Sequence, residues 1–271
     1  MISYCVVRDA YCVKEERNTQ YAIRKGNCDM ENQSKEPDTF FDHFSQDDKS
    51  TKMGTKLVKA LSRRIFRYAE IASGESILEI GPGRGVFADI CLEKGIEYCA
   101  VEPNQQMAAS LEKRGANVIR AMVPPLPAIG KEFDAVVMLA VMEHMNNMQD
   151  AFQITQQIRD VLKPGGKFVI CSPDYLNWRH NFFNCDFSHN YVTTRRRLKQ
   201  LLVNAGFENI KSCYLSGPFT GFVCFLVTAL VSRLPFGLLN AMFADSKLCY
   251  KLYKMQLTFL RKVLILGEKP G

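Results

Sequence analysis

Residues 77–85 read ILEIGPGRG, and their types and spacing could bind a nucleotide-like ligand. An apolar run typical of a buried strand leads into Gly81, Gly83 and Gly85, and a predicted helix follows. Glycines allow a tight turn, so a ligand can approach the backbone and the free N–H groups that begin the helix. Dinucleotide-binding proteins place the last glycine of GxGxxG where this chain has Val86. The GxGxG spacing therefore argues against a dinucleotide, and a plain strand–helix turn is the alternative.

Two glutamates flank this turn where they could hold polar groups of the same ligand. Glu79 precedes Gly81 by two residues and could receive the ammonium group of a bound amino acid. Glu102 follows Gly85 by seventeen residues, at the end of the apolar run 98–101. A carboxylate at the carboxyl end of a second strand can accept both hydroxyls of a ribose. By itself, Glu102 could also be a surface charge or the N-terminal carboxylate of a helix.

His144 is the first candidate for proton transfer, because the ordinary pKa of an imidazole lies near neutrality. A structural histidine packed beneath a lid is an equally good interpretation of this residue. His189 and Tyr191 are the other candidates to enter the pocket, and Asp186 could orient an imidazole there. Glu143 and His144 together offer one carboxylate and one imidazole, whereas Mg²⁺ prefers an octahedral set of oxygens. We therefore expect no metal site.

These residues are positioned by an alternation of short apolar runs and amphipathic stretches, which is typical of a parallel sheet with crossover helices. A turn of proline and paired glycines at 163–166 should separate the last crossover helix from the strand after it. The predicted strands are 76–80, 98–101, 118–121, 135–139, 167–171, 210–215 and 262–266. The predicted helices are 50–72, 86–93, 105–114, 151–162 and 193–204.

The glycine turn, Glu102 and the runs FDAVVMLAVMEHM and VLKPGGKFVICSPDY occur in an order that resembles the class I S-adenosylmethionine-dependent methyltransferases. The resemblance covers roughly residues 50–216, and the ending KVLILGEKP looks like the family's final antiparallel strand. The segment DFSHNYVTTRRRLKQLLVNAGF is similar to small-molecule methyltransferases of ubiquinone biosynthesis and bacterial polysaccharide clusters. The resemblance implies an α/β fold, a Rossmann-like doubly wound seven-stranded sheet whose last strand is antiparallel, and S-adenosylmethionine as cofactor.

Family roles can be carried over to matching positions. The three glycines would border the methionine part of the cofactor, with Glu79 close to its amino group, and Glu102 would bind the ribose. Pro103 and Asn104 would line the adenine side. Leu139 and Ala140 would lie beneath the sulfonium and face the substrate.

Two positions depart from the family pattern. Many relatives place an aspartate for the adenine amino group where this chain has Met122, so the resemblance implies that apolar contact and backbone groups hold the adenine. Ubiquinone-type O-methyltransferases read ExxEH in a run that is associated with a divalent metal. Here Ala140 replaces the first glutamate of that run, which agrees with the expectation of no metal.

The composition is that of an ordinary soluble protein, with 47% hydrophobic and 23% charged residues. The ten cysteines are scattered without a CxxC pair, which indicates a reducing, cytoplasmic compartment. The N-terminus lacks the basic start and apolar stretch of a secretory signal. We expect residues 1–36 to be a poorly ordered extension and 37–271 to be the methyltransferase domain.

Residues 217–259 are the segment least explained by the resemblance. From Gly217 to Ala244 the only charged side chain is Arg233, yet residues 193–271 hold 12 basic and 3 acidic residues, a net charge of +9. We expect an apolar helical insertion that forms either a lid or dimer contact, or an amphipathic hairpin on a membrane surface. A single membrane span would leave 262–266 on the wrong side to join the sheet. In the hairpin interpretation, anionic headgroups would contact a set of basic residues: Lys247, Lys251, Lys254, Arg261 and Lys262.

The sequence thus predicts an enzyme that methylates a small-molecule or lipid-linked acceptor, by resemblance a hydroxyl of a sugar, a glycolipid or a quinone-like ring. His144 or His189 would remove the hydroxyl proton. A nucleic-acid methyltransferase that uses the +9 charge is an alternative, disfavoured because the same region is the most apolar. A non-catalytic relative that binds the cofactor as a scaffold is another. The predicted location is the cytoplasm, with peripheral contact to a membrane as an option.

Overall fold

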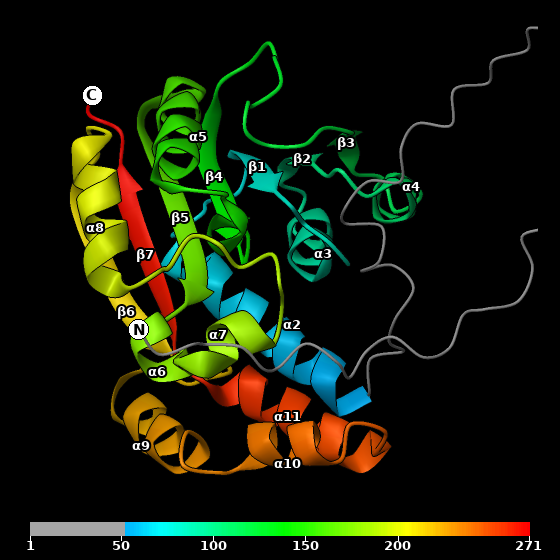
Figure 1. The fold of residues 1–271 in the computed structure, drawn as a ribbon. Coiled ribbons are helices and arrows are strands. Elements are labelled where there is room, and N and C mark those ends of the chain that lie inside the picture. The colour runs from blue at the N-terminus through cyan, green and yellow to red at the C-terminus, as the bar shows by residue number, and fades with distance from the viewer. Residues whose placement is uncertain (1–51) are drawn as a thin grey trace, which may run out of the picture. The chain divides into compact units, whose positions relative to one another are not determined.

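A computed structural model of the chain describes residues 52–271, so the expectations for residues 1–36 and 37–51 lie outside the described part (Figure 1). Within it, seven strands form one sheet in the order β3-β2-β1-β4-β5-β7-β6. The first five strands pair in parallel, and β7 is antiparallel to both β5 and β6. The predicted fold class is confirmed. The strands are β1 (Ser76–Ile80), β2 (Glu97–Val101), β3 (Asn117–Ile119), β4 (Phe133–Leu139), β5 (Leu162–Pro173), β6 (Glu208–Leu215) and β7 (Lys262–Glu268).

Helices cover both faces of the sheet, because successive strand residues point to opposite sides. On one face, Val136 and Met138 of β4 pack in a core with side chains of α5 and α8. On the other face, Ala135 and Val137 of the same strand pack in a core with side chains of α2 and α3. The five predicted helices are therefore present: α2 (Lys52–Tyr68), α3 (Val86–Glu93), α4 (Gln105–Glu112), α5 (Met148–Asp160) and α8 (Arg195–Asn204).

The predicted turn at 163–166 is instead part of β5. Phe133 pairs with Leu162 and Ala135 pairs with Lys167, so the four residues between them form an irregularity within the strand. The ending of the chain stabilises it, because the N–H of Gly165 donates to the Lys269 carbonyl. Glycine and proline therefore bend this strand without ending it.

Three helices follow β6 and form the apolar insertion: α9 (Gly221–Val231), α10 (Phe236–Met242) and α11 (Lys247–Phe259). They lie together at one end of the sheet (Figure 1). Two short helices lie beside them, α6 (Tyr175–Trp178) and α7 (His180–Asn184), which the sequence pattern did not predict. The Gln256 amide of α11 donates to the carbonyls of Val231 at 3.0 Å and Leu234 at 2.7 Å, and so holds the α9–α10 connection against α11. The predicted helical insertion before the last strand is confirmed.

Arg261 and Lys262, at the junction of α11 and β7, do not face outward as the headgroup expectation required. The Arg261 Nε donates to a carboxylate oxygen of the buried Asp174 at 2.7 Å. The Lys262 Nζ donates to the Thr258 carbonyl at 3.1 Å and lies over the Trp178 ring. For these two residues the expectation of headgroup contact is wrong, because the antiparallel pairing of β7 with β5 turns them toward the protein.

Candidate active site

One cavity of about 1330 Å³ opens at the carboxyl ends of β1, β2 and β4. This is where an open α/β sheet places its ligand, since the strand order reverses between β1 and β4. The volume exceeds the roughly 300–1,000 Å³ of an ordinary small-molecule pocket, which leaves room for a cofactor and an acceptor together. The residues predicted to bind the cofactor and the two predicted catalytic histidines all line it: Glu79, Gly81, Gly83, Gly85, Glu102, Pro103, Asn104, Met122, Leu139, Ala140, His144 and His189.

The glycine turn shapes the floor of this cavity through two positions where no side chain fits. Gly81 has φ +65°, and a Cβ there would lie 2.7 Å from the Val141 side chain. Gly85 has φ +72° and caps α3, and a Cβ there would collide with Leu111 and with Arg114. Positive φ and close packing both require glycine at these positions, and a turn of this kind leads from β1 into the N-terminus of α3, where an anion or a polar ligand can bind.

Glu102 is held rigidly by the backbone around it. Its side chain is buried, and its two carboxylate oxygens accept the N–H groups of Gly83 and Asn104, each at 2.9 Å. Each oxygen keeps a second lone pair that can accept a hydroxyl hydrogen. Desolvation by burial raises the pKa of Glu102 and outweighs the two backbone hydrogen bonds, which lower it. The geometry fits a carboxylate that binds two ribose hydroxyls.

Glu79 is a buried carboxyl that lacks a cationic partner among the described residues. It is 2% exposed, and the Tyr98 hydroxyl donates to its Oε2 at 2.5 Å. Burial raises the pKa of Glu79 to about 8 despite this hydrogen bond. An ammonium group in the cavity would restore the charged form, because an opposite charge nearby favours ionisation.

Met122 and Ala140, the two departures from the family pattern, both lie at the cavity wall. Met122 is 44% exposed, between the cavity-lining residues Ala121 and Val123, and therefore offers an apolar surface. Ala140 has φ +56°, a left-handed conformation that is uncommon outside glycine, and its N–H donates to the Cys171 carbonyl at 2.8 Å. Backbone strain of this kind gathers at functional sites.

His144 is oriented by a chain of two further residues. Its Nδ1 lies 2.6 Å from the Ser188 hydroxyl, which itself donates to an oxygen of Asp186 at 2.6 Å. Since the serine hydrogen is used on the carboxylate, the hydroxyl must accept from His144, which places the proton on Nδ1 and leaves Nε2 basic. Burial lowers the pKa of His144, so the ring is neutral at pH 7. Asp186 therefore orients an imidazole as predicted, but through Ser188.

His189 lies beside His144, with ring centroids 4.8 Å apart. Its Nδ1 lies 2.6 Å from the Phe182 carbonyl, which can only accept, so the ring donates its Nδ1–H to that oxygen. Tyr191, the other residue predicted to enter the pocket, instead packs in the core beneath Arg197. The prediction that His189 enters the pocket agrees with the structure, and the same prediction for Tyr191 is wrong.

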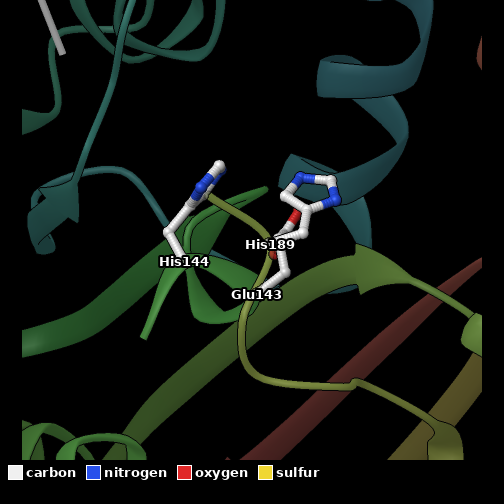
Figure 2. A group of neighbouring side chains, drawn as sticks. All are labelled: Glu143, His144 and His189. Carbon is white, nitrogen blue, oxygen red and sulfur yellow. The ribbon is translucent and has the colours of Figure 1, made fainter. Parts of the chain in front are cut away.

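Glu143 completes a cluster with the two histidines (Figure 2). Its Oε2 accepts the Ser172 hydroxyl at 2.7 Å, while its Oε1 is buried and accepts no hydrogen bond from the part of the chain that the structure describes. One ligand atom from each of Glu143, His144 and His189 lies within 4.8 Å of the others. The three side chains could hold a divalent metal ion, whereas the sequence pattern of Glu143 and His144 alone predicted none.

More than half of the chain matches a known protein family. The methyltransferase-domain family matches residues 52–212, from the first residue of α2 into β6. The chain belongs to the methyltransferase-domain family. The predicted cofactor, S-adenosylmethionine, is the one named for a relative of this chain.

Individual methyltransferases share parts of the chain. A protein of Mycolicibacterium smegmatis named "probable S-adenosylmethionine-dependent methyltransferase" is 27% identical over 148 residues, which cover 52% of this chain and 55% of that protein. A demethylmenaquinone methyltransferase of Tropheryma whipplei is 29% identical over 105 residues, which cover 37% of this chain and 43% of that protein. The chain spans about half or less of the length of the curated relatives that it matches.

A solved structure shares the fold. A methyltransferase from Archaeoglobus fulgidus superposes with a TM-score of 0.54 at 22% identity, over 85% of this chain and 98% of that one. At this identity the likeness concerns the fold alone. It supports the methyltransferase sheet and says nothing of the acceptor.

Several residues of this site had not been predicted from the sequence. Trp178, Ser188, Thr258 and Lys262 all line the cavity. Burial lowers the pKa of Lys262. This lysine reaches the cavity because it pairs with Pro173 at the end of β5, a pairing that the residues near it do not specify. Ser188 had no signal of its own, since a serine in a loop is common and its role depends on where the loop folds.

Proposed function

We propose that this methyltransferase-family chain transfers the methyl group of S-adenosylmethionine to a hydroxyl oxygen of a small or lipid-linked acceptor. The observation that carries the proposal is one continuous cavity with two kinds of wall. The glycine turn with Glu79 and Glu102 suits the cofactor. The His144–Ser188–Asp186 chain suits removal of a proton from an acceptor.

The residues of the first wall fit S-adenosylmethionine. Glu79 would receive the ammonium group, Glu102 would receive the ribose hydroxyls, and the turn of Gly81 and Gly85 would border the methionine part. Pro103, Asn104 and Met122 would contact the adenine side, and Leu139 and Ala140 would lie near the sulfonium. When bound, the cofactor supplies a methyl group made electrophilic by the positive sulfur.

The residues of the second wall supply alignment and a base. His144 would accept the hydroxyl proton of the acceptor at Nε2, and the acceptor oxygen would receive the methyl group that the bound cofactor supplies. The resulting imidazolium still donates its Nδ1–H to Ser188, and Asp186 stabilises the charge through that hydroxyl. Exclusion of water by Trp178 and the surrounding apolar wall protects the reacting groups.

An apolar, quinone-type acceptor is supported by the lining of the cavity and by the name of one relative. The demethylmenaquinone methyltransferase that matches part of the chain acts, by its name, on a quinone-type compound. Aromatic and aliphatic side chains line the cavity beside His144. They could contact an apolar ring while His144 contacts a hydroxyl group on that ring. Sugar and glycolipid hydroxyls remain within the same class of acceptor, an alcohol or phenol oxygen.

Nucleic acid is disfavoured by the arginines that would contact phosphates. Arg195 lies over the Tyr214 ring and donates to the Ser212 hydroxyl at 2.8 Å. Arg197 lies over the Tyr191 ring. Two of the three consecutive arginines are therefore used within the fold, although the whole segment 193–271 is basic.

The proposal is tested by incubating the full chain with isotopically labelled S-adenosylmethionine and an extract of lipids and small molecules, followed by mass spectrometry of the products. We expect label on an oxygen of an apolar hydroxyl compound. Label on nitrogen or on nucleic acid would overturn the acceptor class. A chelator in a parallel reaction tests the metal: activity without change assigns proton removal to His144 alone, and loss that Mn²⁺ or Zn²⁺ restores assigns a metal to the Glu143–His144–His189 cluster.

A further inference from the structure

The outer surface of α9 and α10 is apolar and exposed, and we call it the apolar face. In α9 only Cys224 and Thr228 are buried, so the smaller side chains point toward the protein. None of the seven residues of α10, all of them described, is buried. The apolar face comprises Phe222 (75% exposed), Val223, Phe225, Leu226, Leu230 (68%), Leu234, Leu238 (62%), Met242 (64%) and Phe243.

This arrangement is the reverse of an ordinary surface helix. A helix of a water-soluble domain turns its apolar stripe to the core, and a helix that is apolar on all sides is normally buried. Isolated exposed leucines are common, but adjoining phenylalanines and leucines over two successive helices mark a binding surface. Something apolar should therefore cover the apolar face.

The dimensions exclude a single crossing of a bilayer. Gly221–Met242 is long and apolar enough to span by length and composition, with mean hydropathy 2.0. The segment is however broken at 232–235, and α9 has 11 residues, about 16 Å at 1.5 Å per residue, against a hydrocarbon core of about 30 Å. β6 and β7, which flank the insertion, pair in one sheet, so both ends lie on the same side. A helical hairpin in the plane of an interface satisfies these constraints.

The charged residues around the apolar face indicate what kind of partner covers it. Arg233 is the one charged residue between Gly217 and Ala244, and it is exposed at the connection of α9 and α10. On the neighbouring α11, Lys247, Lys251 and Lys254 are exposed as well. Asp245 is the single acidic residue from 217 to 267. A basic border around an apolar surface complements anionic headgroups above acyl chains.

The insertion also reaches the cavity. Thr258 of α11 and Lys262 of β7 line the cavity, together with Trp178 of α6. Figure 1 shows α11 packed between α10 and the rest of the domain, so the helix that carries the lysines also carries a wall residue of the acceptor side. A molecule dissolved in the membrane would approach the cavity past this helix.

We propose that α9 and α10 insert their apolar face into the interface of an anionic lipid membrane, and that the methyl acceptor is taken from that membrane. The second part rests on the proposed methyl transfer. The first part does not, because binding to lipid requires no chemistry.

Co-sedimentation of the full chain with vesicles tests the membrane contact. Vesicles of phosphatidylcholine with one third phosphatidylglycerol are compared with phosphatidylcholine alone. We expect the wild-type chain to sediment with the anionic vesicles and the double variant F222S/L230S to bind at least tenfold more weakly. The control variant M148S/V203S removes exposed apolar side chains of α5 and α8, 60% and 54% exposed, and should bind as the wild type does. The variant K247Q/K251Q/K254Q should lose the preference for anionic vesicles.

Two results would overturn the proposal. One is equal sedimentation of wild type and F222S/L230S. The other is a dimer in vesicle-free buffer that F222S/L230S dissociates, with no binding to vesicles, which would assign the apolar face to a second copy of the chain. Calorimetry of the same variants with S-adenosylmethionine separates the two proposals: unchanged cofactor binding with lost sedimentation affects only the membrane contact.

Discussion

The wall of the cavity that we propose binds the cofactor (the cofactor wall) and the wall that we propose faces the acceptor (the acceptor wall) are built in different ways. On the cofactor wall, Glu102 is fixed by backbone N–H groups of Gly83 and Asn104, which lie within 19 residues of it in the sequence. On the acceptor wall, His144 is fixed by the side chain of Ser188, 44 residues away, and the loop of Ser188 is fixed in turn by N–H groups that reach the Glu143 carbonyl. A turn therefore builds the cofactor wall, and tertiary packing builds the acceptor wall.

This difference separates binding from chemistry in a testable way. Changes in the cofactor wall should alter affinity for S-adenosylmethionine and leave the chemical step intact at saturation. Changes in the acceptor wall should lower turnover and leave cofactor affinity intact. A variant that moved both quantities would show that the two walls are coupled.

The largest effect is expected from His144→Ala. Loss of a general base should lower kcat by about 10²- to 10⁴-fold, while calorimetry shows an unchanged Kd for S-adenosylmethionine. In the wild type, burial holds the pKa of His144 below its ordinary value, so kcat/KM should rise with pH on a limb below about pH 6.5 and be flat above it. Full activity of His144→Ala would eliminate this residue as the base.

Ser188→Ala is the matched variant of the acceptor wall. It leaves the imidazole in place but removes its link to Asp186, so we expect a loss of kcat of about tenfold. The imidazolium loses its stabilising partner, which lowers the pKa of His144 and moves the acidic limb of the profile to lower pH. An unshifted limb would mean that Ser188 has only a packing role.

On the cofactor wall, Glu102→Ala should weaken binding of S-adenosylmethionine by about 10- to 100-fold, because hydrogen bonds to a charged group contribute about 1.5–3 kcal/mol. At saturating cofactor, kcat should stay within about twofold of the wild type. Isothermal calorimetry and initial rates measure the two quantities. A fall in kcat with unchanged Kd would contradict a ribose-binding role.

A proton should be released when the cofactor binds. Without the cofactor, Glu79 should be protonated below about pH 8, because burial raises its pKa to about 8, whereas a nearby ammonium group favours the charged form. At pH 6.5, calorimetry in two buffers of different ionisation enthalpy should report about one proton released, and Glu79→Gln should report none. Affinity for the cofactor should rise with pH up to about pH 8 in the wild type alone.

The same pKa has a consequence for the stability of the protein without cofactor. Below about pH 8 the folded state retains a proton that the unfolded state loses near pH 4 to 5, so the free energy of unfolding falls as pH rises through that window. Glu79→Gln should flatten this dependence.

The smallest effect is expected at Met122. Replacement by aspartate supplies the carboxylate that many relatives place near the adenine amino group, and one added hydrogen bond should tighten cofactor binding by about 2- to 10-fold. Met122→Leu is the control and should bind as the wild type does. Unchanged binding in Met122→Asp would place the adenine away from this position.

The sequence predicted the parts of the fold that depend on local patterns. β1 and α3 have the predicted bounds of 76–80 and 86–93, because an apolar run, three glycines and an amphipathic stretch each determine their own segment. The predicted cofactor-binding residues line the cavity, because the carboxyl ends of parallel strands converge at one edge of the sheet.

The parts that could not be predicted depend on contacts between distant segments. The turn at 163–166 became part of β5 because the chain's ending pairs with it. Tyr191 packs in the core because of the path of its loop, and Lys262 faces the cavity because of the pairing of β7 with β5. Residues close in the sequence specify neither the path nor the pairing. Ser188 gained its role only when its loop folded onto His144.

The central claim is that this cavity binds S-adenosylmethionine, and calorimetry with three ligands tests it most directly. S-adenosylmethionine, S-adenosylhomocysteine and NAD are each titrated into the wild-type chain and into Gly81→Ala, in which a Cβ would meet Val141. The account predicts that the wild type binds the first two and not NAD, and that Gly81→Ala loses both. Binding of NAD alone, or cofactor binding that Gly81→Ala leaves unchanged, would contradict it.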